Sequence, residues 1–208
     1  MSPAPLVLLL VAQSAAAPEP VRPKPPTGLS WEDADHVAET VARIERRVKA
    51  GKPASARPIT LSDKQLNSYV ALTLGPELPP VISGVSIRFE PDRFAANGML
   101  DLDAVRSKLP TSGPGSLLAF VSGTVPVALK GRFQGADGLG RVEVEEALVA
   151  GFSLPPTMLA QIVAQQTRTQ KRPEGFDLLS PFPLPWTARS IKLEPGRALI
   201  GFSQKPSR

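Results

Sequence analysis

The sequence predicts an α+β protein with three helices and six to eight antiparallel strands. Three observations carry this prediction: a helical period that begins at Ser30, a second helical period capped at Ser62, and a period of two that begins at Val85 and recurs towards the end of the chain. Helix faces repeat every three to four residues and strand faces every two, so the two periods separate helix from strand. The length of 208 residues fits a single domain.

The two N-terminal helices have clear start and stop signals. Ser30 precedes the first helix, whose apolar residues recur at steps of three and four until Gly51 ends it. Acidic residues lie early in this helix and basic residues late, which complements the helix dipole and gives the basic cluster a structural explanation. The second helix begins at the capping box Ser62–Gln65 and ends at Gly75.

Two later segments match each other and predict two hairpins. Residues 86–93 read Ser-Ile-Arg-Phe-Glu-Pro-Asp-Arg, and residues 190–197 read Ser-Ile-Lys-Leu-Glu-Pro-Gly-Arg. In each segment an alternating strand runs into a tight turn with proline at its second position, and a second strand returns. Two explanations of the match are open. The same turn sequence could have arisen twice independently, or the two hairpins could lie at equivalent edges of one sheet.

The segment between these hairpins predicts two more strands and a helix. Alternation predicts a strand over residues 125–133, and a partner strand from Val142 to Phe152. Glu145-Glu146 interrupts the alternation of the partner, which predicts a β-bulge there. Leu154-Pro155-Pro156 opens the third helix with proline in its first turn. The apolar stripe of this helix is Met158, Leu159, Ile162 and Val163.

The N-terminal segment predicts export. Residues 1–17 are uncharged, and the apolar run Leu6–Ala12 precedes Ala15-Ala16-Ala17, a pattern typical of a signal-peptide cleavage site. We therefore expect a signal peptide at 1–17, a proline-rich linker at 18–29 and one α+β domain at 30–208, located in the periplasm or outside the cell. No Lys or Arg precedes the apolar run, which leaves a misassigned start codon and a disordered apolar tail as alternatives.

Residue counts argue against metal sites and against cysteine- or histidine-dependent catalysis, although counting alone leaves carboxylate chemistry open, and we expect no enzyme and no cofactor. The chain has no cysteine and a single histidine, His36, on the first predicted helix. A zinc site needs several nitrogen or sulfur ligands and a hydrolase serine needs a base beside it, so neither is predicted. Glu143 and Glu145 alternate with valines and are expected on a solvent face. Aromatic residues make up only 5% and the predicted export removes nucleic acid as a partner.

The order of the elements resembles a protein family. Five segments carry the resemblance. They are Ile59-Thr60-Leu61-Ser62-Asp63-Lys64-Gln65-Leu66-Asn67, the hairpin from Val85, the central strands to Phe152, the helix opened by Leu154-Pro155, and Phe182-Pro183-Leu184-Pro185 before the last hairpin. They are similar to segments of small exported bacterial proteins of unknown function, which resemble the tubular lipid-binding (TULIP-like) superfamily. The resemblance covers residues 59–202. It departs at Trp186-Thr187, where Gly-Ile is expected, and this leaves the start of the last hairpin open.

The resemblance implies a curved antiparallel sheet wrapped around a long helix, with an apolar groove for acyl chains. The ligand-binding residues would be Val125, Val127, Leu129, Phe133, Met158, Leu159 and Ile162. We therefore expect a non-catalytic lipid- or amphiphile-binding protein of the cell envelope, with the membrane surface as a further candidate partner. In the alternative, these residues form a dry core and the protein is an envelope scaffold or protein-partner-binding module. The sequence sets no oligomeric state.

Overall fold

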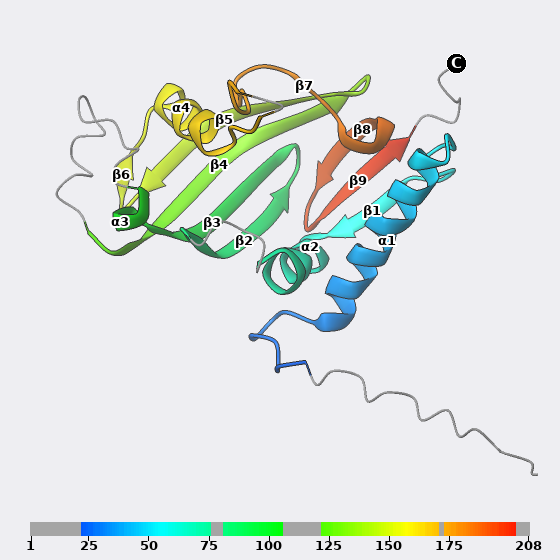
Figure 1. The fold of residues 1–208 in the computed structure, drawn as a ribbon, viewed down its shortest axis with the longest axis horizontal. Coiled ribbons are helices and arrows are strands. Elements are labelled where there is room, and N and C mark those ends of the chain that lie inside the picture. The colour runs from blue at the N-terminus through cyan, green and yellow to red at the C-terminus, as the bar shows by residue number, and fades with distance from the viewer. Residues whose placement is uncertain (1–21, 76–80, 106–121, 171–172, 203–208) are drawn as a thin grey trace, which may run out of the picture.

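The computed structural model describes residues 22–75, 81–105, 122–170 and 173–202. These residues form four α-helices and a nine-stranded antiparallel sheet that does not close, so the α+β prediction is confirmed (Figure 1). The predicted signal peptide lies outside the described residues.

The described residues contain one α-helix more than the three predicted and one strand more than the upper limit of eight. In chain order they are α1 (Trp31–Lys49), β1 (Ile59–Ser62), α2 (Asp63–Tyr69), β2 (Ile82–Glu90), β3 (Arg93–Asp101), α3 (Leu102–Val105), β4 (Thr124–Ala136), β5 (Leu139–Val149), β6 (Phe152–Ser153), α4 (Pro156–Gln166), β7 (Phe182–Pro183), β8 (Ala188–Glu194) and β9 (Arg197–Phe202). A π-helical turn, Val70–Leu74, continues α2. The extra helix is α3, a single turn that brings Leu102 into the core, where it is 1% exposed.

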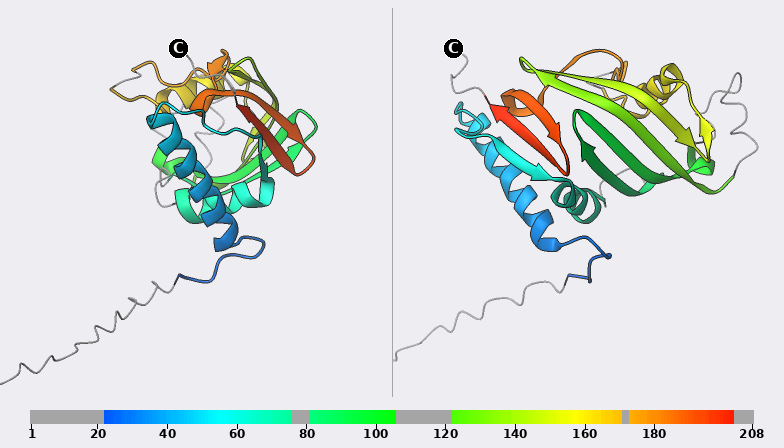
Figure 2. Two further views of the ribbon diagram at one scale, coloured as in Figure 1. Left: turned by 90° about the vertical axis from the view of Figure 1, so that its right-hand side faces the viewer. Right: turned by 180° about the vertical axis from the view of Figure 1, so that it is seen from behind.

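β3 and β8 lie end to end along one edge of β4 and divide the sheet into two lobes. Arg93 of β3 pairs with Arg132, and Ile191 of β8 pairs with Gly135, while β5 follows the other edge of β4. We call β2–β6 with α4 the large lobe, and β1, β8 and β9 with α1 and α2 the small lobe. Figure 2 shows the two lobes as separate groups of strands that meet near the end of β4.

The two matched hairpins meet at their tips. Each has a two-residue turn that begins with proline, so the predicted pair of tight turns is confirmed. The Asp92 N–H donates to the Leu193 carbonyl (3.2 Å), and the Gly196 N–H donates to the Phe89 carbonyl (3.0 Å). In the sequence match Asp92 is equivalent to Gly196, and Phe89 to Leu193, so the two bonds are reciprocal, as in a local two-fold arrangement. The matched segments are therefore equivalent hairpins of one sheet.

Asp92 has a left-handed backbone, with φ of 56°, where the equivalent Gly196 has φ of 72°. A side chain raises the energy of this conformation and glycine avoids that penalty. We expect Asp92→Gly to raise the free energy of unfolding by about 0.5–1 kcal/mol, measured as a higher urea midpoint at unchanged m-value. Gly196→Ala is the counterpart and should lower the midpoint. A lower midpoint for both variants would contradict this account of the turns.

A bulge keeps the apolar residues of β5 on one face of the sheet. Lys130 pairs with Glu146, and the next residue of β4, Gly131, pairs with Val144, so Glu145 is the extra residue. The bulge predicted at Glu145-Glu146 is therefore confirmed. Without the extra residue, the alternation would send Glu146 to the side on which Val144 lies.

The end of β5 differs from the prediction. The strand stops at Val149 and does not run to Phe152. Ala150 and Gly151 both have left-handed φ values, 52° and 83°, and turn the chain back. The returning residues form β6, in which Phe152 pairs with Val149. A turn replaces the predicted continuation because two successive left-handed residues reverse a strand.

The long helix α1 lies beside the small lobe. It contacts α2, the π-helical turn and the short turn Pro185–Thr187 before β8 (Figure 1). The expectation of a sheet wrapped around a long helix is therefore not confirmed; the shorter α4 is the helix that contacts β5. Trp186 and Thr187, where the family resemblance breaks, have φ of 53° and 60° and form the turn. The last hairpin begins directly after it, at Ala188.

The described part of the predicted linker makes side-chain contacts with α1. The Arg22 guanidinium ion-pairs with Asp35 (2.6 Å) and lies 4.7 Å above the centre of the Trp31 ring. The Trp31 indole N–H donates to the Pro23 carbonyl (2.8 Å). Exposed ion pairs and cation–π contacts each contribute about 1 kcal/mol or less. The contacts hold the end of the linker to the first turns of the helix.

Asn67 of α2 closes the free edge of the large lobe. Its side-chain nitrogen donates to the Ile87 carbonyl (2.8 Å), and the Ile87 N–H donates to its side-chain oxygen (2.7 Å). β2 is the last strand on this side of the described sheet, so these groups of Ile87 face no further strand. The side chain of Asn67 takes the place of a neighbouring strand.

Candidate functional site

The inner face of the large lobe is apolar throughout. The register of β2–β5 aligns nineteen residues on one side of the sheet, and the residues between them point to the other side. The nineteen are Ile82, Val85, Ile87, Phe89, Phe94, Ala96, Gly98, Leu100, Val125, Val127, Leu129, Gly131, Phe133, Gly135, Gly140, Val142, Val144, Ala147 and Val149. Four adjacent strands thus present a face without a polar side chain, which suits either an apolar ligand or a core.

The outer face of the same strands carries the charges. Lys130 ion-pairs with Glu146 (2.7 Å), while Arg93 and Arg132 share Glu145 (3.1 and 2.8 Å). The hydrogen bond to Glu146 raises the pKa of Lys130 above its ordinary value. Arg93, Lys130 and Arg132 are thus each paired with a carboxylate of the same face. The charged side chains of these strands thus lie on the outer face, which also carries apolar residues such as Ala95 and Met99.

α4 covers only one end of the inner face. Met158, Leu159 and Ile162 pack against a buried cluster that includes Leu102 and Val149. The helix carries no charged residue, yet none of its described side chains is fully buried. An uncharged helix inside a completed core would normally bury one stripe of residues. α4 therefore packs against the sheet without burying any of its described side chains completely.

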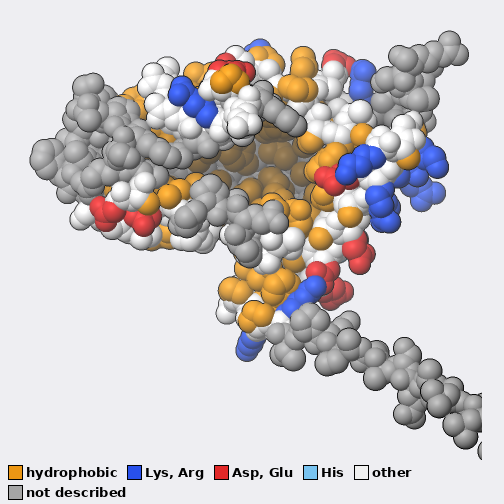
Figure 3. Space-filling model, in the orientation of Figure 1, with side chains coloured by type: hydrophobic (Ala, Val, Ile, Leu, Met, Phe, Trp, Pro, Cys, Tyr) orange, Lys and Arg blue, Asp and Glu red, His pale blue; other side chains and the backbone are white. Residues whose placement is uncertain are grey.

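The rest of the inner face lies under a hollow. Ile87, Phe94, Ala96, Val127 and Leu129 are only half-buried, although they belong to the interior face of the sheet. Figure 3 shows a depression with hydrophobic side chains on its floor, in the part of the view where Figure 1 draws β2–β4. The described side chains leave the space above this face partly open.

The structure brings six of the seven predicted site residues together. One cluster contains Val125, Val127 and Leu129 of β4 with Met158, Leu159 and Ile162 of α4. Phe133 lies farther along β4 in a second cluster, where its ring centre is 6.4 Å from that of Phe182. Val125 is 6% exposed and belongs to the core. Sequence reasoning missed Ile87, Phe94 and Ala96, because only the strand register places them beside β4.

The inner face is the strongest functional feature of the described chain. No family model, curated protein or solved structure matches this protein. Within the described residues, no helix is both long and apolar enough to cross a membrane. In the same residues, no three His, Asp or Glu side chains are grouped as metal ligands. His36 is exposed on α1.

A separate cleft of about 580 Å³ opens where β3 and β8 diverge along β4. Its charged lining residues are Asp92 and the cations Arg93, Arg132 and Lys192. Each of these cations already has a carboxylate partner. The cleft therefore offers a ligand no unpaired charge among these three, and it is a weaker candidate than the inner face.

Proposed function

We propose that the protein binds an acyl-chain amphiphile against the inner face of the large lobe. It would act as an exported, non-catalytic lipid-binding protein of the cell envelope. The observation that carries the proposal is the uninterrupted apolar face beneath a hollow that the described side chains leave partly open. The predicted signal peptide supports the envelope location, and the TULIP-like resemblance agrees with this class of ligand.

In this proposal the ligand takes the place that the resemblance assigns to a long helix. α4 would hold one end of the acyl chain, and the curved sheet would enclose the remainder. Each buried methylene contributes about 0.8 kcal/mol, so about eight of them give roughly 6 kcal/mol before the entropy lost on association. Because the inner face offers no polar side chain, selectivity should follow chain length more than head group.

Filling the hollow tests the proposal. Ala96 lies on the inner face, paired with Leu129 on one side and Ile87 on the other. We expect Ala96→Phe to weaken the binding of a fluorescent fatty acid by about tenfold or more, because the new ring occupies ligand space. Thermal unfolding should be little changed. Ala95→Phe is the matched control, since Ala95 lies next to it on the outer face, and it should bind as the wild type does.

The alternative, an envelope scaffold with a filled core, gives a different result. There Ala96→Phe overpacks the interior and destabilises the protein by about 1–3 kcal/mol. That loss, together with no binding of fatty acid, lysophospholipid or phospholipid by well-folded wild type, would exclude the proposal. If binding is found, mass spectrometry of organic extracts from gently purified protein identifies the class of the natural ligand.

A further inference from the structure

The net charge of the chain is concentrated in one short segment. Residues 43–57 contain six basic side chains and one acidic side chain, and the rest of the chain contains eighteen of each. The segment therefore accounts for the whole net charge of +5. We call its six bases the basic patch: Arg43, Arg46, Arg47, Lys49, Lys52 and Arg57.

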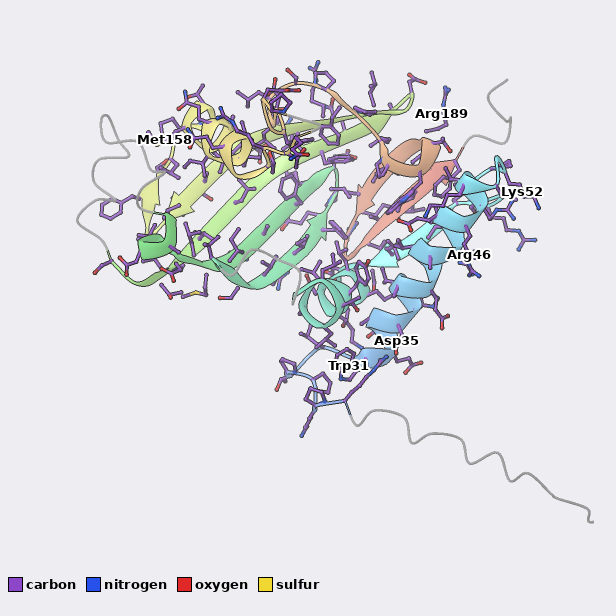
Figure 4. The ribbon with its side chains drawn as sticks, viewed as in Figure 1. Trp31, Asp35, Arg46, Lys52, Met158 and Arg189 are labelled. Carbon is purple, nitrogen blue, oxygen red and sulfur yellow. The ribbon has the colours of Figure 1, made fainter. Side chains whose placement is uncertain are left out.

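The fold gathers the basic patch at one end of α1. Arg46 and Arg47 lie three and four residues after Arg43, so each is a neighbour of Arg43 on the helix surface. The loop after α1 folds back on it, because the Lys52 N–H donates to the Arg47 carbonyl (2.9 Å) and the Arg47 guanidinium donates to the Pro53 carbonyl (2.7 Å). Figure 4 labels Arg46 and Lys52 at this end of the helix, and Figure 3 shows a group of Lys and Arg side chains there.

The cations of the basic patch have no carboxylate partner within the described residues. Elsewhere in those residues eight Lys and Arg side chains make ion pairs. Five of the six patch side chains are exposed, and Arg47 is half-buried. The helix dipole accounts for bases in the last turn of α1. It does not account for Lys52 and Arg57, which lie beyond the helix.

We propose that the basic patch docks on a bilayer surface that contains anionic phospholipid. The phosphates of the head groups would be the partners of its unpaired cations. The segment has no aromatic residue, so it lacks both the stacking platform of a single-strand nucleic-acid site and the aromatic anchors common in protein interfaces. Exposed, flexible cations suit a fluid array of phosphates. The inference does not depend on amphiphile binding at the inner face.

Co-sedimentation of the full chain with vesicles tests the inference. The vesicles are phosphatidylcholine alone, or phosphatidylcholine with about 30 mol% phosphatidylglycerol. The patch variant is the triple Arg46→Gln, Lys49→Gln, Lys52→Gln. The control is the triple Lys24→Gln, Arg88→Gln, Arg141→Gln, which removes the same charge from exposed side chains that also make no ion pair among the described residues.

We expect the wild type to bind only the anionic vesicles and to dissociate as the salt concentration rises. A basic residue near an anionic surface contributes about a fivefold change in partitioning, so the patch variant should bind on the order of a hundredfold more weakly. The control should stay within about threefold of the wild type. Fatty-acid binding and thermal unfolding of the patch variant should be unchanged, which separates this inference from the function of the inner face.

Two results would overturn the inference. Equal losses in the patch and control triples would mean that net charge, and not the location of the patch, governs binding. Binding of soluble polyphosphate or single-stranded DNA without any binding to anionic vesicles would assign the patch to another polyanion.

Discussion

Replacing Asn67 with alanine is expected to lower the free energy of unfolding by about 2–3 kcal/mol. The side chain makes both hydrogen bonds to the Ile87 backbone at the free edge of β2. Its removal leaves a partly buried N–H and a partly buried carbonyl without their partners, and the penalty for such groups exceeds the net value of the bonds. Urea unfolding of the wild type and the variant measures the difference.

Two further variants make the Asn67 result specific. Asn97→Ala changes the same residue type on the outer face of β3, where Asn97 is exposed, and should alter stability by no more than about 0.5 kcal/mol. Asn67→Asp keeps an acceptor for the Ile87 N–H and loses the donor to the Ile87 carbonyl, so it should fall between the wild type and Asn67→Ala. Equal stabilities for the two alanine variants would show that the two hydrogen bonds from Asn67 to the Ile87 backbone do not contribute to the free energy of unfolding.

Gly135→Ala is expected to destabilise the protein by about 3 kcal/mol or more. A Cβ at this position would lie 2.8 Å from the Ile191 nitrogen and 2.9 Å from the Ile191 carbonyl oxygen. These are backbone atoms of β8, so the overlap can be relieved only by separating β8 from β4. The two lobes are joined at this pairing. A thermal melt that also becomes broader or splits in two would show that the lobes have come apart.

Gly75→Ala is the matched control for Gly135→Ala. A Cβ at Gly75 meets only the Val70 carbonyl oxygen, at an ordinary 3.6 Å, and Gly75 has helical backbone angles. Alanine there should be neutral or stabilise the protein by up to about 1 kcal/mol. If the two glycine variants had the same stability, the close approach of β8 to β4 at Gly135 would be excluded.

Local chemistry made the element types predictable from the sequence. The Ser62 hydroxyl accepts from the Gln65 N–H (3.1 Å) and the Gln65 side chain accepts from the Ser62 N–H (3.0 Å), as the capping-box pattern predicts. The bulge at Glu145 was predictable because adjacent acids cannot both face outward in a regular strand. Each of these features depends on residues within a few positions of one another.

Long-range pairing was not predictable in the same way. Nothing local indicates that β8 continues along β4 where β3 ends, yet this pairing moves Phe133 out of the predicted groove and into the junction of the lobes. The inner face was predictable in part. The alternation from Val125 to Phe133 indicated one strand of it, but Phe94 and Ala96 join it only through the pairing register. The position of α1 beside the small lobe likewise depends on tertiary contacts.

The pairing of β1 with β9 has a consequence for biosynthesis. β1 pairs with β9 from Ile59–Ile200 to Ser62–Arg197, so one of the first strands made is completed by the last. Translation proceeds at about 5–20 residues per second, so β9 is synthesised on the order of ten seconds after β1. During that time the half-buried Ile59 and Leu61 have no strand beside them. The growing chain thus cannot complete its small lobe until the residues of β9, up to Ile200, have been made.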